Sequence, residues 1–263
     1  MAIDMSERYI AEHTRGPGQD RLRALIALSP FIRRYRRALR FLTRGQRYHG
    51  TAECRIGVGL DNCASHFQKH RWALVENFFS DDFHEELLAQ WPSRYEFNPP
   101  STLKKSYDIG FVWRAGKEFE SRESIRKYSA LTKLHGYLRS TECAQRLSRV
   151  HGGGANLRCS LFVMHMTRRG SQVIPHKDSN YRLKRPVLNI LMFVNGQGGR
   201  NGGGLAISRD NELSDVIVEA SNVRNSALLY DVKADFYHGF KPIDRQKFRW
   251  SMSAEFRDED TQL

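Results

Sequence analysis

The chain has 263 residues and a formal net charge of +13, with 42 Lys and Arg against 29 Asp and Glu. Its 40% hydrophobic and 11% aromatic content is enough for a sizeable core and excludes wholesale disorder, a collagen-like chain or a coiled coil. The sequence shows no charge-free apolar run of membrane-spanning length, no secretory signal and no C-x-x-C pair among its four cysteines. We therefore predict a folded protein of a reducing, cytoplasmic compartment.

Residues 1–50 carry eleven Arg, no Lys and four acidic residues. Ser29-Pro30 is typical of a helix start, and apolar residues between Phe31 and Leu42 recur at three- and four-residue spacing among the arginines. One interpretation of this basic amphipathic helix is that it packs on the following domain or is solvated. Another is that residues 21–47 lie on an anionic membrane surface, on the inner face of a membrane. Nucleic acid is a third, less favoured partner.

After the basic region, the composition predicts three segments. Residues 51–71 contain glycines and form a connector, residues 72–257 form a globular domain, and residues 258–263 form a short tail. The first elements expected in the domain are a strand over 73–79, a helix over 81–91 and a helical stretch over 121–150.

Short β-type segments then follow in quick succession, separated by Gly, Asn and Asp turns. Eight strands at this spacing predict a sandwich or barrel over about 156–257. The segments are Asn156–Met166, Gln172–His176, Pro186–Val194, Gly204–Ser208, Val216–Glu219, Ala227–Asp231, Phe236–Phe240 and Phe248–Phe256.

Metal-ligating residues recur within these predicted strands. Residues two apart on a strand point to the same side, so His176 and Asp178 can hold one cation, with His238 supplied by a later strand. Two histidines and one carboxylate leave coordination positions open, as non-haem Fe(II) oxygen chemistry requires, whereas a structural zinc site is closed. Arg249 follows at the head of the last predicted strand.

In this order and spacing, the four residues resemble the motif of the Fe(II)/2-oxoglutarate-dependent dioxygenases, in particular the branch related to prolyl 4-hydroxylases. The glycine-rich stretch 195–205 is similar to that family's asparagine turn and glycine pair. The resemblance covers about residues 72–257. It implies an α+β fold with a double-stranded β-helix (a jelly-roll, cupin-like core) and supporting helices, here preceded by the basic amphipathic helix.

The resemblance also implies roles for individual residues. His176, Asp178 and His238 would be the catalytic metal ligands of Fe(II), and 2-oxoglutarate would chelate that metal. Arg249 would hold the distal carboxylate of 2-oxoglutarate, with a hydrogen bond from Ser251. O2 would take the remaining position, giving succinate, CO2 and a hydroxylated product, and ascorbate would stimulate the reaction.

One position departs from the family pattern. Many relatives carry a tyrosine on the third core strand that supports the distal carboxylate of 2-oxoglutarate. The nearest residue here is Phe193. We therefore expect Asn189, or His165 on the first core strand, to take over that role in binding the co-substrate.

Basic residues near the metal motif indicate the charge of the substrate. Loops at the mouth of a β-helix usually select the substrate, so this concentration of cations favours an anionic small molecule or glycolipid. Arg168 and Arg169 precede the motif, and the residues expected to contact substrate are Arg182, Lys184, Arg185 and Arg200.

Three substrate classes and one non-enzymatic alternative remain open. The favoured one is hydroxylation of an acidic sugar or lipid-linked glycan, as in the 3-deoxy-manno-octulosonate hydroxylases. A prolyl-type protein hydroxylase explains the motif order but not the basic helix. A nucleic-acid demethylase of the AlkB type ranks third, because its second arginine would fall at Glu255. The last alternative is a binding module that has kept the fold without catalysis.

Overall fold

The computed structural model describes residues 52–57, 59–98, 106–115, 127–152, 154–178, 187–196, 202–244 and 248–259. The predicted basic helix of residues 21–47 lies outside these ranges, and so do Arg182, Lys184, Arg185 and Arg200. In the described part of the chain, no helix has the length and apolar character needed to cross a bilayer.

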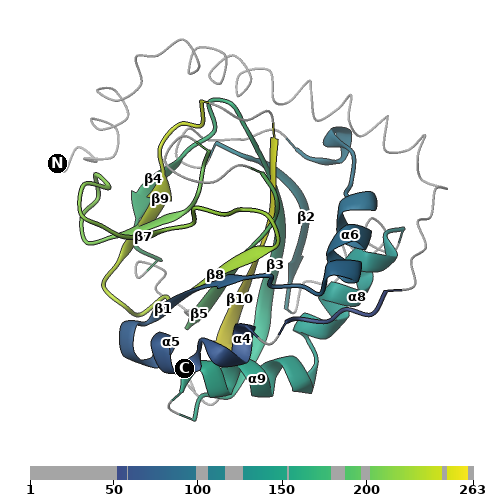
Figure 1. Cartoon of the computed structure of the whole chain (residues 1–263), viewed down its shortest axis with the longest axis horizontal. Coiled ribbons are helices and arrows are strands. Elements are labelled where there is room, and N and C mark those ends of the chain that lie inside the picture. The colour runs from purple at the N-terminus through teal and green to yellow at the C-terminus, as the bar shows by residue number, and fades with distance from the viewer. Residues whose placement is uncertain are drawn as a thin grey trace.

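Two antiparallel sheets face each other across the centre of the molecule (Figure 1). The larger sheet has the strand order β1-β8-β5-β10-β3-β2, and the smaller has the order β4-β9-β6-β7. Their bounds are β1 Trp72–Glu76, β2 Asp108–Arg114, β3 Leu157–Arg168, β4 Val173–His176, β5 Leu188–Asn195, β6 Ala206–Ser208, β7 Val216–Glu219, β8 Ser226–Asp231, β9 Tyr237–Phe240 and β10 Phe248–Asp258.

Strands β3 to β10 are the eight strands predicted from the sequence. Four of them, β3, β5, β8 and β10, lie in the larger sheet and the other four make up the smaller one, which is the arrangement of a double-stranded β-helix, so the predicted fold class is confirmed. Strands β1 and β2 extend the larger sheet at its two edges. The strand predicted over 73–79 is the shorter β1, which ends before Asn77, where the backbone turns to a positive φ of 49°.

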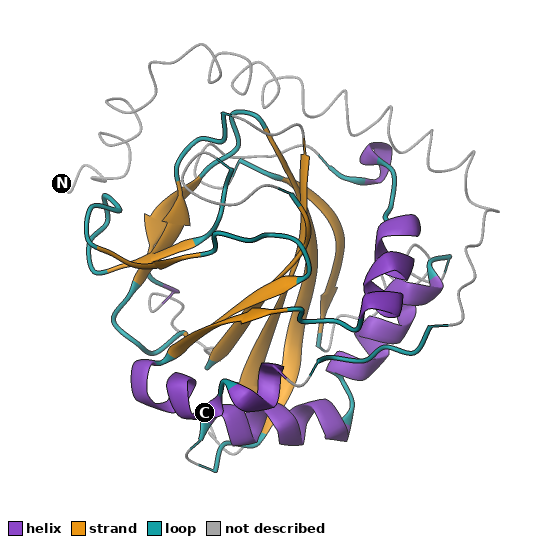
Figure 2. Cartoon of the chain, in the orientation of Figure 1, coloured by secondary structure: helices purple, strands orange, loops and turns teal. Residues whose placement is uncertain are grey.

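The larger sheet is buried on both faces, which explains why β5 reads as an almost continuous apolar run. Ile190 and Met192 belong to the core that the helices cover, whereas Leu191 and Phe193 belong to the core between the sheets. Successive side chains on a strand point to opposite faces. The two cores therefore share one backbone layer, and Figure 2 shows the helices gathered on its outer side.

The helices cover that outer face. The predicted helical stretch 121–150 consists of two helices over its described part, because Ser140 interrupts it: the Ser140 Oγ accepts a hydrogen bond from the backbone N–H of Cys143 at 3.1 Å and so caps a new helix. The helix predicted over 81–91 is α6. The helices are α4 Gly59–Asn62, α5 Ala64–His70, α6 Asp81–Ala89, α8 Ser129–Leu138 and α9 Thr141–His151, with a 3-10 turn, η1, over Arg94–Glu96.

The connector predicted over residues 51–71 is wrong for its described part. Helices α4 and α5 lie there, and both Leu60 and Phe67 are completely buried in the core under the larger sheet. At the end of α5, the guanidinium of Arg71 pairs with the carboxylate of Asp231 on β8. The segment therefore belongs to the folded unit.

We expect Phe67→Ala to lower the free energy of unfolding by roughly 3–5 kcal/mol, because it removes a fully buried aromatic ring and leaves a cavity. Lys69→Ala, an exposed position on the same helix, is the matched control and should change stability by about 0.5 kcal/mol or less. Urea denaturation followed by circular dichroism measures both. Equal stability of the two variants would restore the connector interpretation.

Candidate active site

The metal-ligating residues come together where β4 pairs with β9. His176 and His238 are direct cross-strand partners, and their ring centroids lie 4.4 Å apart. Gly239 allows the strands to approach this closely. A Cβ at that position would lie 2.5 Å from the carbonyl oxygen of Val173 and 2.9 Å from Cα of Pro175. The sequence thus fixes the spacing of the two imidazoles through the backbone.

Asp178 completes the triad just beyond the end of β4. One carboxylate oxygen, Oδ1, lies 3.5 Å from Nε2 of His176, and the other, Oδ2, lies 3.6 Å from Nε2 of His238. The ligand atoms of the three residues all lie within 4.8 Å of one another. Among the described residues, this is where three or more His, Cys, Asp or Glu side chains are grouped closely enough to hold a metal ion.

The protonation of His176 suits metal binding. Its Nδ1 lies 2.9 Å from the carbonyl oxygen of Ile174, and because a carbonyl only accepts, Nδ1 carries the proton. The lone pair is therefore on Nε2, the atom that faces Asp178. A backbone acceptor behind a ligating imidazole is the usual arrangement that fixes the ring and its tautomer. The triad is thus chemically ready for a divalent metal with open coordination positions.

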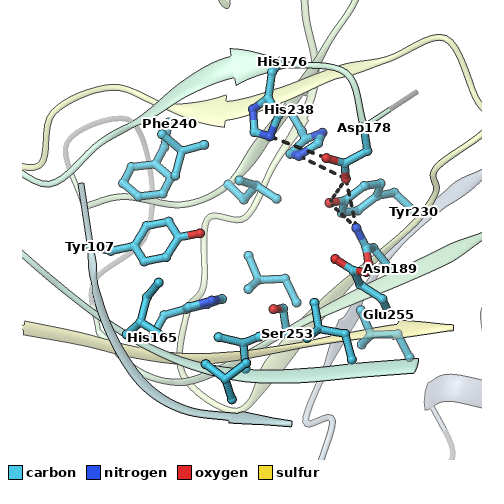
Figure 3. Close-up of a pocket in the computed structure, with 18 of the residues that line it drawn as sticks. Tyr107, His165, His176, Asp178, Asn189, Tyr230, His238, Phe240, Ser253 and Glu255 are labelled. Atoms are coloured by element: carbon cyan, nitrogen blue, oxygen red, sulfur yellow. Dashed lines mark hydrogen bonds and ion pairs between the residues drawn. The ribbon is translucent and has the colours of Figure 1, made fainter. Parts of the chain in front are cut away.

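Two side chains from the larger sheet hold the Asp178 carboxylate. The Asn189 Nδ2 donates to Oδ2 at 3.1 Å, and the Tyr230 hydroxyl donates to the same oxygen at 3.4 Å (Figure 3). Asn189 also donates to the Tyr230 oxygen at 2.9 Å. Burial, reinforced by the charge of Asp178, raises the pKa of Tyr230 well above its ordinary value. The phenol therefore stays protonated and donates.

This position corrects the role predicted for Asn189. We expected it to support the distal carboxylate of the co-substrate, but it pairs across the strands with Glu255, six residues along β10 from Arg249. On a strand this separation is about 20 Å. Asn189 thus serves the metal carboxylate, and the amide is too far from Arg249 for the predicted role.

A cavity of about 270 Å³ lies between the sheets and opens beside the triad. Its floor is the inner face of β10, from which Arg249, Ser253 and Glu255 line it. Figure 3 shows Tyr107, His165 and Phe240 on the side of the cavity opposite Asn189 and Glu255. The cavity therefore has two chemically different ends, with the triad above it.

One end is built around Arg249, which is only 2% exposed. Its guanidinium carbon lies 4.6 Å from the ring centroid of Phe240 and 5.3 Å from that of Phe193. Gly203, with a φ of 77°, lies beside the guanidinium and accepts no side chain, because a Cβ there would lie 2.4 Å from Cδ1 of Ile243. Phe193, which replaces the expected tyrosine, thus offers a π-face in place of a hydroxyl.

The Arg249 head group has unused donors. Its Nε and Nη1 are buried and donate no hydrogen bond to any residue that the structure describes, and the same is true of the Ser251 hydroxyl. Burial lowers the pKa of Arg249 to about 9, so the side chain is still a cation at neutral pH. A buried cation with unused donors lowers the stability of the protein by itself, and binding of an anion would compensate for that loss. A carboxylate fits this demand in charge and geometry.

Tyr107 is a site residue that the sequence analysis missed. Its ring lies 4.6 Å from that of His165, and its hydroxyl points into the cavity (Figure 3). The ion pair between the neighbouring Asp108 and Arg168, at 2.6 Å, fixes the start of β2 beside β3. His165 lies opposite Ser251 in the register of β3 and β10, and its role in binding the co-substrate stays a prediction.

The four residues predicted to contact substrate lie outside the described ranges, but the two arginines that precede the metal motif are described. Arg168 belongs to the ion pair with buried Asp108, whereas Arg169 is exposed. Glu255 of β10 pairs with Leu161 of β3, and Leu161 pairs in turn with Arg114 of β2. Arg114 therefore lines the cavity at the end away from Arg249.

Tyr230 was also missed by the sequence analysis, because an aromatic residue within an apolar strand is typical of an ordinary core.

No protein-family model matches the chain, and no curated protein matches its sequence. Solved structures do match its fold. A prolyl hydroxylase from Trichoplax adhaerens, in complex with a hypoxia-inducible-factor peptide fragment, is 19% identical over 76% of this chain and 90% of its own, with a TM-score of 0.57. A prolyl 4-hydroxylase from Pseudomonas putida is 18% identical over 76% and 99%, with a TM-score of 0.54.

A third structure broadens the comparison beyond prolyl hydroxylases. It is a 2-oxoglutarate-Fe(II) oxygenase-family oxidoreductase from Burkholderia pseudomallei, 13% identical over 79% of this chain and 96% of its own, with a TM-score of 0.56. The chain therefore has the double-stranded β-helix fold of the Fe(II)/2-oxoglutarate-dependent oxygenases, in the form found in prolyl 4-hydroxylases.

Proposed function

We propose that this protein is an Fe(II)/2-oxoglutarate-dependent dioxygenase that hydroxylates a C–H bond of an anionic substrate. The observation that carries the proposal is the combination of a two-histidine, one-carboxylate triad with a cavity whose closed end holds a buried arginine with unused donors. Fe(II), with 2-oxoglutarate and O2 as co-substrates, supplies the oxidant for this chemistry, with succinate and CO2 as co-products.

The triad residues would hold the metal. The Asp178 carboxylate lies 3.5 Å from Nε2 of His176 and 3.6 Å from Nε2 of His238. The three residues are therefore close enough to bind one cation together. The hydrogen bonds from Asn189 and Tyr230 fix the Asp178 carboxylate, so the ligand does not have to be ordered when the metal binds.

Arg249 would bind the distal carboxylate of 2-oxoglutarate. The guanidinium offers unused donors at Nε and Nη1, and the hydroxyl of Ser251, two residues along the same strand, offers another. Tyr107 supplies a hydroxyl on the same side of the cavity, close enough for its charge to affect the pKa of Arg249. We infer that Tyr107 replaces the hydroxyl that Phe193 lacks, with His165 packed behind its ring.

The walls of the cavity exclude water from the reacting groups. Val173 and Phe240 line it from the smaller sheet, Leu205 from the residue just before β6, and Val163 and Leu191 from the larger sheet. In such apolar surroundings the carboxylate–guanidinium pair is stronger than in water. The closed end thus orients the co-substrate, and the open end admits the molecule to be oxidised.

The proposed substrate is an acidic sugar or a lipid-linked glycan. It rests on the basic residues of the sequence near the metal motif. A prolyl-type protein hydroxylase is the second candidate, since two structures with this fold are prolyl hydroxylases and one of them holds a peptide fragment. Association of residues 21–47 with an anionic membrane surface stays a prediction from the sequence.

We expect purified protein supplied with Fe(II), ascorbate and 2-oxoglutarate to release succinate slowly without its substrate. His176→Ala and Asp178→Ala should lower this release at least about 100-fold, because loss of a ligand exceeds the effect of losing a residue behind one. His66→Ala, at an exposed histidine on α5, is the control and should keep the wild-type rate. Undiminished release from either triad variant would refute the assignment.

We expect Arg249→Met to stabilise the protein without ligands while abolishing the response to 2-oxoglutarate. Because the pKa of Arg249 is lowered in the folded state, the cost of burying its charge is present below about pH 9 and fades as the pH rises above that value. Removing the charge should raise the free energy of unfolding at pH 7 by about 1–4 kcal/mol.

Thermal unfolding with Mn(II), with and without 2-oxoglutarate, measures both effects of Arg249→Met. The wild-type protein should gain stability on adding 2-oxoglutarate, and the variant should not. Arg209→Met removes an exposed arginine that pairs with Asp215 and should leave both quantities unchanged. An equal response in wild type and Arg249→Met would place the dicarboxylate elsewhere.

We expect Tyr107→Phe to raise the concentration of 2-oxoglutarate required for half-maximal succinate release by about 3- to 10-fold, the loss of one hydrogen bond. The maximal rate should change little, because the ring contact with His165 is kept. Tyr137→Phe removes a hydroxyl that hydrogen-bonds Arg146 instead and serves as the control. An unchanged requirement in Tyr107→Phe would remove this hydroxyl from the co-substrate site.

A further inference from the structure

The side chains on the inner face of the larger sheet form rows that run across the strands. Residues that pair directly in register point to the same face of a sheet, so one row can be followed through all six strands. It passes through Tyr230, Asn189 and Glu255, which Figure 3 shows together on one side of the cavity. From edge to edge, this mouth row consists of Trp72, Tyr230, Asn189, Glu255, Leu161 and Arg114.

The next row inward separates the mouth row from the Arg249 end of the cavity. All of its members except Ser253 are apolar, and they are Leu74, Leu228, Leu191, Ser253, Val163 and Val112. Ser251 belongs to the row beyond, and Arg249 lies further still along β10. A carboxylate bound at Arg249 therefore has an apolar band between itself and the mouth row, and the two ends of the cavity bind different molecules.

The metal ligands touch the mouth row directly. Asp178 accepts hydrogen bonds from Asn189 and Tyr230, so the metal that it would hold lies beside this part of the row. Arg114 lies three strand spacings from Asn189, or about 14 Å. Because Arg114 is exposed and Glu255 is partly exposed, the cavity opens along this row. The molecule that is oxidised therefore lies along the mouth row, across the strands.

Arg114 is the cation of the mouth row. Other exposed arginines, such as Arg55 and Arg209, each pair with a carboxylate. Arg114 forms no ion pair with Glu255 or with any other residue that the structure describes. Its side chain nevertheless lines the cavity that contains the triad. A guanidinium presents its donors in a planar fork that matches the oxygens of a carboxylate or a phosphate.

The carboxylate of Glu255 leaves the Arg114 end of the row open to an anion. Leu161 lies between the two residues in the register, so they are two strand spacings apart, or about 10 Å. Repulsion between charges at that separation is weaker than the attraction in a direct contact between an oxyanion and the guanidinium. An anionic group of the ligand is therefore held at Arg114.

Given the proposed function, on which this step rests, we infer that Arg114 binds an oxyanion of the substrate, a carboxylate or a phosphate, while the substrate lies along the mouth row with its oxidised carbon beside the metal. The spacing of the strands places that anionic group roughly 10–15 Å from the metal. The anionic group therefore belongs to a different part of the substrate from the one that is oxidised. Arg114 is thus a specificity-determining residue.

The test uses the full chain loaded with Mn(II) and saturating 2-oxoglutarate, so that the metal is paramagnetic and the Arg249 end is filled. Propionate and propionamide have nearly the same shape, but only propionate is charged, and methyl phosphate is a second oxyanion. Proton relaxation measures the binding of each probe and its distance from the metal. We expect both oxyanions to show about tenfold greater enhancement than propionamide, the effect of a hydrogen bond between charged groups, at a distance of roughly 10–15 Å.

Variants at position 114 connect that preference to the guanidinium. Arg114→Gln should lower the enhancement of both oxyanions about tenfold, to the level of propionamide. Arg114→Lys, which keeps the charge without the planar fork, should lower it only about threefold. Arg139→Gln changes an exposed arginine that stacks on Trp113, on the opposite face of β2, and should have no effect. Binding of Mn(II), followed by water relaxation, confirms that each variant is folded and loaded.

The outcomes separate this inference from the proposed function. Failure to bind Mn(II), or binding that His176→Ala leaves unchanged, would refute the metal site itself. Normal binding of Mn(II) and 2-oxoglutarate, with equal enhancement of propionate and propionamide, would overturn the anion subsite alone. The same holds if Arg114→Gln behaves like the wild type, if the oxyanions bind in direct contact with the metal, or if no probe is relaxed.

Discussion

The pairing of β4 with β9 is the constraint on which the site depends. Each strand has only four residues, yet their register places His176 directly opposite His238. So short a ladder is weak by itself, and it is held by its neighbours: Val173 and Phe240 belong to the core between the sheets. Only glycine fits at position 239, so this residue allows β4 and β9 to approach each other closely. A bound metal would tie the same two strands together.

The space between the sheets is polar where an ordinary β-sandwich would be apolar. Arg249 lies there between two phenyl rings, with donors that no described residue uses. In the absence of a ligand this arrangement lowers stability, because the charge is buried without hydrogen bonds. The same feature gives the ligand its binding energy, since an anion satisfies donors that already point in the right direction. Stability and binding are therefore opposed at this residue.

Local patterns revealed most of the fold. Eight strands were predictable because buried apolar runs alternate with turn residues over the second half of the chain. The break between α8 and α9 was missed, because it depends on one serine hydroxyl that caps a new helix. The connector was misjudged for a different reason: Leu60 and Phe67 are isolated among polar residues, and only the tertiary structure shows that both are buried. Glycines there suggested a loop.

The metal triad could be predicted because its spacing is a property of strands, whereas the partners of each side chain could not. Asn189 lies on a strand that is buried on both faces, so its sequence gives no indication of which face it points to. The register with Glu255 and Tyr230 decides that it serves Asp178. Tyr107 belongs to β2, which joins the larger sheet from outside the eight core strands. No local signal connects it with Arg249.

Strand β10 shows how topology changes the meaning of a pattern. Polar residues at 249, 251, 253 and 255 alternate with apolar residues at 250, 252, 254 and 256, a pattern that ordinarily indicates one face in solvent. Here β3 and β5 flank the strand on both sides, and the smaller sheet covers its polar face. A polar stripe in the middle of a covered sheet cannot be a solvated surface. Such a stripe is retained where the protein needs charge and hydrogen bonds inside, and Arg249, buried and with unused donors, is the clearest case.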